Sequence, residues 1–186
     1  ELISSGGDYS KINIESYETY VVKSVNTTDK YIVDINKTTA TGNTLYIDDT
    51  SGNTVIDMKN TSGSTVALSG LAQYNVLSVR KGTGASGRQS LTITVSNKNV
   101  SGAIKSINTV DRKINIAGTS YDISNYLVKY GSNIINALSV GDTYKCYLDK
   151  DGKIAHMVKS TSTSTFVGYI AAAEGDRSGS VKIALI

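Results

Sequence analysis

The chain has 186 residues, of which 39% are hydrophobic and 19% are charged, so it is long enough for one mid-sized domain or two small ones. It contains no apolar run near 18 residues, and its 19 Lys and Arg are interleaved with 16 Asp and Glu for a net charge of +3. These values exclude a disordered or collagen-like chain, and they give no basis for membrane insertion or a nucleic-acid surface.

Short segments of alternating apolar and polar residues recur along the chain and predict strands of about five residues. The clearest lie at residues 20–25, 30–35, 44–47 and 91–95. Turn-forming residues separate them, as at 49–53, 60–64 and 82–87. Residues 69–72 and 124–138 could each hold a turn or two of helix. The sequence therefore predicts an all-β protein with little helix.

An internal repeat divides the chain. Residues 23–30 return at 105–112 with five identities and two conservative changes, and both copies lie between two apolar runs, which is typical of a hairpin. A second hairpin at 74–95 is similar to one at 144–158. We therefore expect two tandem β-barrel or β-sandwich units, the first at 1–99 and the second at 100–186.

The last pair of expected strands, within residues 166–186, has two interpretations. It could open a partial third repeat, or it could be a closing hairpin that covers an exposed edge of the second unit. The sequence leaves both open.

The second unit resembles the β-rich repeats of clostridial cell-surface proteins that carry S-layer homology domains. The residues that carry the resemblance are 100–107, 114–124, 138–144 and 147–155, which are similar to the family patterns V-x-G-x-I, I-x-I-x-G-x-x-Y, V-G-D and L-D-x-D-G-K-I. The first unit lacks V-G-D, and the S-layer homology modules themselves are not seen here.

The resemblance implies an exported protein of a Gram-positive bacterium, at the cell surface or in the cell wall. The implied role is that of a non-catalytic structural or spacer region, associated with the S-layer and acting through packing. Its expected partners are other cell-surface proteins or a cell-wall polymer. The alternative is a carbohydrate-binding module that recognises cell-wall glycan or polysaccharide through exposed tyrosines.

Twelve tyrosines support that alternative, because an aromatic ring can stack on a sugar. A sugar face requires several rings exposed in one plane. Otherwise tyrosines at sheet edges and domain seams bury the ring and leave the hydroxyl in water. The candidate sugar contacts are Tyr121, Tyr126, Tyr130, Tyr144 and Tyr147.

Asp149 and Asp151 begin a pattern similar to a calcium loop, but the later ligand positions hold Lys153 and Ser160, neither of which is acidic. A hairpin turn is the favoured interpretation, and the same holds for the pair Asp48 and Asp49. The sequence predicts no metal site and no cofactor.

Cys146 and His156 are the only cysteine and histidine, and we expect them to face each other across one hairpin. A Cys-His nucleophile would also need an orienting group and an oxyanion site, which the sequence does not indicate. We expect Cys146 in an apolar core and His156 on a strand surface. No spacing marks a Lys-Asn cross-link, and the glycines at 82–87 predict a hairpin tip. The sequence therefore does not predict an enzyme.

Overall fold

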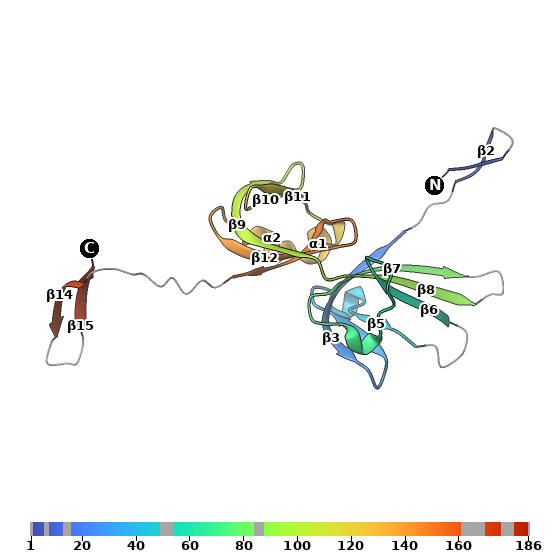
Figure 1. Cartoon of the computed structure of the whole chain (residues 1–186), viewed down its shortest axis with the longest axis horizontal. Helices are drawn as coiled ribbons and strands as arrows, with labels where there is room; N and C mark the ends of the chain where they lie inside the picture. Colours follow the sequence, from blue (N-terminus) through green and yellow to red (C-terminus); the bar gives the residue numbers. More distant parts are fainter. Residues whose placement is uncertain are drawn as a thin grey trace.

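The computed structural model describes residues 2–5, 8–12, 16–48, 54–83, 88–160, 170–175 and 181–185, and side chains are described for 16–48, 54–83 and 88–160. Within these ranges the chain forms one six-stranded sheet, one five-stranded sheet and two separate hairpins (Figure 1). The predicted all-β class with little helix is confirmed.

The six-stranded sheet belongs to the first unit and has the order β5-β4-β3-β7-β8-β6. Its pairs are antiparallel except that β6 runs parallel to β8. Two short 3₁₀ helices, η1 (Thr39–Thr41) and η2 (Leu68–Gly70), lie in its connections. The strands are β3 (Glu18–Asn26), β4 (Tyr31–Asp34), β5 (Thr44–Tyr46), β6 (Thr54–Asn60), β7 (Val76–Thr83) and β8 (Gln89–Ser96).

The five-stranded sheet belongs to the second unit, is antiparallel throughout and has the order β11-β10-β9-β12-β13. Helices α1 (Asn125–Tyr130) and α2 (Ser132–Asn136) connect β11 to β12, and the Ser124 hydroxyl caps α1 by accepting the N–H of Leu127. The strands are β9 (Asn99–Asn108), β10 (Lys113–Ile116), β11 (Thr119–Asp122), β12 (Thr143–Leu148) and β13 (Ile154–Lys159).

The two edges of this second sheet meet at one point. The first half of β9 pairs with β12 and its second half pairs with β10, so the strand serves both sides of the curved sheet. A bridge between Ile123 and Ile154 then joins the end of β11 to the start of β13, and the Ser124 N–H donates to the Ile154 carbonyl at 2.9 Å.

Two hairpins stand outside these sheets. β1 (Leu2–Ser5) pairs with β2 (Asp8–Ile12), and β14 (Ile170–Gly175) pairs with β15 (Val181–Leu185). Among the described strands, β14 and β15 pair with each other. The partial third repeat and the closing hairpin both stay predictions.

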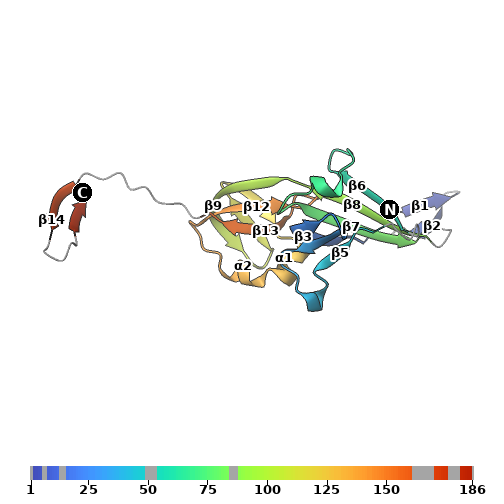
Figure 2. The ribbon, with the colours of Figure 1, turned by 90° about the horizontal axis from the view of Figure 1, so that it is seen from below.

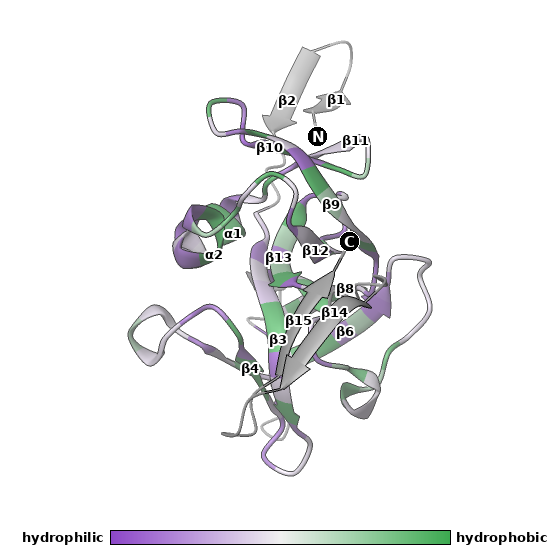
Figure 3. Cartoon of the chain, turned by 90° about the vertical axis from the view of Figure 1, so that its left-hand side faces the viewer, coloured by the Kyte–Doolittle hydropathy of each residue, from purple (hydrophilic) through white to green (hydrophobic). Residues whose placement is uncertain are grey.

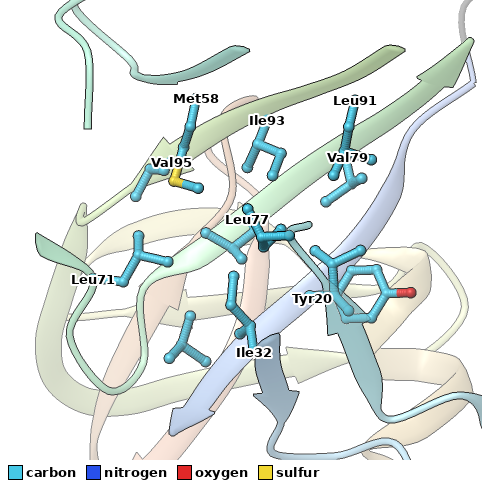
Figure 4. Packing of buried hydrophobic residues seen from close by; sticks show 12 residues of the cluster. Tyr20, Ile32, Met58, Leu71, Leu77, Val79, Leu91, Ile93 and Val95 are labelled. Atoms are coloured by element: carbon cyan, nitrogen blue, oxygen red, sulfur yellow. The ribbon is translucent and has the colours of Figure 1, made fainter. Parts of the chain in front are cut away.

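Each unit has its own hydrophobic core. The first core surrounds Leu77, with Ile32, Val79 and Leu71 close by and the Tyr20 hydroxyl pointing away (Figure 4). The second core contains Ile114, Leu127 and, as predicted, Cys146. Figure 3 shows both hydrophobic and hydrophilic stretches along β3, as expected for a strand that carries core residues on one face. The two cores share no residue.

The repeated segments form matching turns. The Asn26 carboxamide accepts the N–H of Asp29 at 2.8 Å and donates to the Asp29 carboxylate at 2.9 Å. Asn108 makes the same two bonds with Asp111, at 3.0 and 2.8 Å. Each turn ends at a residue with φ of 51°, Lys30 or Arg112. The side-chain bonds explain why both copies retain Asn and Asp at this spacing.

The correspondence between the two units extends from these turns into the sheets. The register of the hairpin shifts at Lys23 in the first unit and at Lys105 in the second. The strand order β5-β4-β3-β7-β8 then corresponds to β11-β10-β9-β12-β13. The middle segments differ, since the first unit inserts β6 and η2 where the second has α1 and α2.

Ile32 and Ile114 occupy equivalent, fully buried positions in the two cores. We expect Ile32→Ala and Ile114→Ala each to lower the free energy of unfolding by about 2–5 kcal/mol, because each leaves a cavity. Amide hydrogen exchange checks the separation of the cores: Ile114→Ala should accelerate exchange mainly in β9–β13, and Ile32→Ala mainly in β3–β8. Equal acceleration in both sheets by either variant would contradict two separate cores.

Candidate functional site

The five tyrosines proposed as sugar contacts do not form an exposed row. Tyr126 and Tyr144 are buried, and Tyr121, Tyr130 and Tyr147 are half-buried. Tyr121 and Tyr144 pack with the second core, whereas the other three contact a cluster between the units. A sugar ring needs an open aromatic face, so the burial of these rings does not support a sugar face made by this set.

The Asp149 carboxylate serves the turn that it begins. Its Oδ1 accepts the N–H groups of Asp151 and Lys153, both at 2.9 Å, and Gly152 takes a φ of 79° in the same turn. Burial raises the pKa of Asp149, and these two backbone bonds oppose the rise. Asp151 is exposed and pairs with Lys150 at 2.8 Å. The geometry supports the hairpin-turn interpretation.

The other metal-ligating candidates of the sequence do not gather into one site either. Within the described ranges, no group of three or more His, Cys, Asp or Glu side chains could hold a metal ion. Asp49 and residues 84–87 of the glycine-rich tip lie outside the described residues.

Cys146 and His156 lie on opposite faces of their hairpin, contrary to prediction, and His156 is buried where a strand surface was predicted. Cys146 pairs with Met157 in the second core, whereas His156 pairs with Tyr147 and packs toward the first unit. Burial raises the pKa of the Cys146 thiol to about 12. A thiol in this state is a poor nucleophile at neutral pH, and no Cys-His pair forms.

The two units meet at a seam, which is the most elaborate polar site in the described part of the chain. Its apolar members are Val21, Val76, Tyr126 and Ala155, with Ile35, Tyr130 and Tyr147 packed against them. Val21 and Val76 come from the first unit, while the tyrosines and Ala155 come from the second. β13 contacts β3 across this seam (Figures 1 and 2).

Asp34, at the end of β4, is the buried acid of the seam. One carboxylate oxygen accepts the N–H of Val21 at 2.8 Å, and the other accepts the N–H groups of Asn36 and Lys37 at 2.8 and 2.7 Å. The Tyr126 hydroxyl donates to that second oxygen at 2.6 Å from the other unit. Burial, followed by the Asp34 charge, raises the pKa of Tyr126, so its hydroxyl stays protonated and donates.

Lys37 adds a buried cation to the seam. Its side chain is fully buried, and its ammonium lies 3.3 Å from the centre of the Tyr20 ring and 2.7 Å from Glu18 Oε1. The ring centres of Tyr130 and Tyr126 lie 5.4 and 6.0 Å from the same ammonium. Rings of both units therefore form an aromatic cage around it. Cation–π attraction is strongest where water is removed, as here.

The carboxylate of Glu18 completes the cage from its open side. Burial by itself would raise its pKa, but the hydrogen bond and charge of Lys37 lower the pKa below its ordinary value. Glu18 also pairs with Lys81 at 3.2 Å.

Tyr74, His156 and Tyr147 form a stack on the other side of the seam. The Tyr74 ring lies 4.7 Å from Tyr147 and 5.4 Å from His156, centre to centre. Burial lowers the pKa of His156 to about 4, against an opposing effect of the Asp34 charge. His156 is therefore neutral at pH 7, and its buried Nδ1 has no hydrogen-bond partner within the described ranges.

Tyr74 adopts a backbone conformation that usually favours glycine. Its φ is 69°, and its N–H donates to Val22. The equivalent position in the second unit is Gly141, with φ of 97° and a bond to Ile104. A non-glycine residue in this region costs roughly 1 kcal/mol. We infer that the inter-unit stack offsets this cost at Tyr74.

Sequence reasoning did not single out Asp34 and Lys37. The sequence does contain a signal for Asp34. The alternation of β4 places Asp34 on the same inward face as Ile32. The equivalent position in the second unit holds Ile116, an apolar residue. A charged residue in place of a core residue indicates a buried partner.

No protein-family model, curated protein or solved structure matches this chain. Among the described residues, none of the helices has the length and apolar character needed to cross a membrane.

We expect stability to depend on the His156 pKa. Because its folded pKa lies below the ordinary 6.5, the unfolded chain binds a proton first, and the free energy of unfolding should fall as pH drops from about 6.5 to about 4. The loss is at most about 3.5 kcal/mol at ~1.4 kcal/mol per pKa unit. Urea unfolding of the wild type and of His156→Phe measures it. An unchanged slope in His156→Phe would contradict this assignment.

Calcium should not stabilise the Asp149 turn. We expect millimolar calcium to leave the Tm unchanged, because Asp149 Oδ1 is already bonded to two N–H groups. Asp149→Ala should cost about 1–3 kcal/mol without calcium, since both donors lose their acceptor. The exposed neighbour offers a control, and Asp151→Ala should change stability by less than about 0.5 kcal/mol. A calcium-dependent rise in Tm that Asp149→Ala abolishes would restore the cation-site interpretation.

Proposed function

We propose that this chain is a non-catalytic structural spacer in an exported bacterial cell-surface protein, in which two tandem units act through packing and protein contacts. The sequence resemblance to S-layer-associated repeats supports the location at the cell surface or in the cell wall. The matching turns and sheet order support a tandem duplication.

The seam is the observation that carries the proposal. A spacer must hold its units in one orientation, and here a buried acid of the first unit receives a hydrogen bond from the second at 2.6 Å. The connection is also short, since β8 ends at Ser96 and β9 begins at Asn99. A linker of this length gives the units little freedom to separate.

The chemistry of the described side chains supports a non-catalytic role. A general acid-base group works best with a pKa near the operating pH. Burial instead lowers the pKa of His156 to about 4 and raises the pKa of the Cys146 thiol to about 12. Both residues contribute to packing instead. The mixed surface charge favours protein or cell-wall polymer partners over nucleic acid.

Removing the Tyr126 hydroxyl tests the rigidity of the tandem. We expect Tyr126→Phe, combined with Lys37→Met, to uncouple the two units while both sheets remain folded, because Asp34 keeps its three backbone donors. Residual dipolar couplings should fit one alignment tensor for both units of the wild type. In the double variant, the tensors of the two units should differ.

Tyr144→Phe is the matched control, since its hydroxyl bonds to Ala137 inside the second unit at 3.4 Å. It should leave one common tensor. Two independent tensors in the wild type would contradict a rigid spacer, and so would one unchanged tensor in the double variant.

A further inference from the structure

The sheet edges that meet in the second unit do not meet in the first. In the second unit, Ile123 bridges Ile154. Ile47 corresponds to Ile123, because the N–H of each donates to the residue that ends the matching turn, at 2.7 and 2.8 Å. Leu91 corresponds to Ile154 within its hairpin. No bridge joins Ile47 to Leu91 in the described part of the first unit.

The reason is the extra strand. β6 pairs with β8 over the whole of Thr54–Asn60, so the edge of β8 that would meet the end of β5 is already occupied. A cavity of about 330 Å³ remains between β5 and the β8–β6 pair. This volume lies within the usual range of small-molecule sites.

Polar groups of several kinds line this cavity. Asp48 supplies acceptors, Lys81 supplies a cationic donor, and the Gln89 carboxamide supplies both. Lys81 is also tied to Glu18 at 3.2 Å, which restrains its ammonium. Hydroxyl groups come from Thr44, Thr54 and Ser90.

Apolar groups complete the lining. Leu45 and Leu91 are buried members of the first core and border the cavity from inside. Tyr46 also lines it and is 67% exposed, the most exposed tyrosine among the described side chains. An edge contact with Tyr31, at 5.9 Å between ring centres, restrains the Tyr46 ring.

We propose that this cavity is a binding site for a short, neutral saccharide. A sugar ring presents many hydroxyl groups at its edge and apolar C–H groups on its face, which match the mixed polar lining and the open ring of Tyr46. Charges of both signs disfavour a purely anionic ligand. An extended peptide fits less well, because β5 offers only three residues of strand edge.

The cavity touches the seam only through Lys81, whose partner Glu18 also binds Lys37, and it adds a ligand to the proposed spacer role. None of the five tyrosines singled out in the sequence lines it. The sequence raised sugar binding at tyrosines of the second unit, whereas the site proposed here lies in the first unit.

Titration of the ¹⁵N-labelled chain with cellobiose or N,N′-diacetylchitobiose tests the proposal. We expect at least one disaccharide to cause saturable shifts of the amides at 44–48 and 89–91 at millimolar concentration. Tyr46→Ala and Gln89→Ala should each weaken binding at least tenfold while the remaining spectrum stays folded.

Tyr17→Ala is the matched control, since Tyr17 is also exposed but lies outside the cavity, and it should leave the affinity unchanged. Absence of saturable shifts with both disaccharides would overturn the proposal. Equal binding by Tyr46→Ala would overturn this location. If a hexapeptide of alternating Thr and Val shifts the same amides and the disaccharides do not, the cavity is a peptide site and the saccharide assignment is wrong.

Discussion

A carboxylate removed from water must receive hydrogen bonds, and Asp34 obtains them from both halves of the tandem. Three backbone N–H groups of its own unit surround it, and the fourth donor is the Tyr126 hydroxyl of the next unit. Leaving a buried charge without its partners typically costs 3–5 kcal/mol. Each unit has its own hydrophobic core, but the acid of the first is fully satisfied only when the second is docked.

The other groups of the seam follow from this arrangement. Lys37 adds a cation to the seam, which pairs with Glu18 and is accommodated by rings from both units. His156 remains neutral, which adds no further charge to the buried site. Tyr74 adopts a backbone conformation that its counterpart Gly141 adopts freely, and its ring stacks on Tyr147. The apolar cores lie within the units, and the polar seam lies between them.

The sequence predicted those features that depend on local residue order. Alternation located the strands, and the recurrence of Asn and Asp located the two matching turns, because their hydrogen bonds span only three residues. Tertiary contacts were beyond such reasoning. The parallel pairing of β6 with β8 leaves no local signal, and the bond between Asp34 and Tyr126 joins residues 92 positions apart. The tyrosines drew attention as surface rings, whereas three of the five pack at the seam.

The burial of Lys37 also gives the tandem a chemical signature. An amine-reactive acylating reagent must reach the Lys Nζ atom, and that of Lys37 is enclosed by aromatic rings and held by Glu18. Lysines such as Lys59 and Lys113, about half exposed, offer no such protection. The labelling rate at Lys37, read by mass spectrometry, therefore reports how often the two units part in solution.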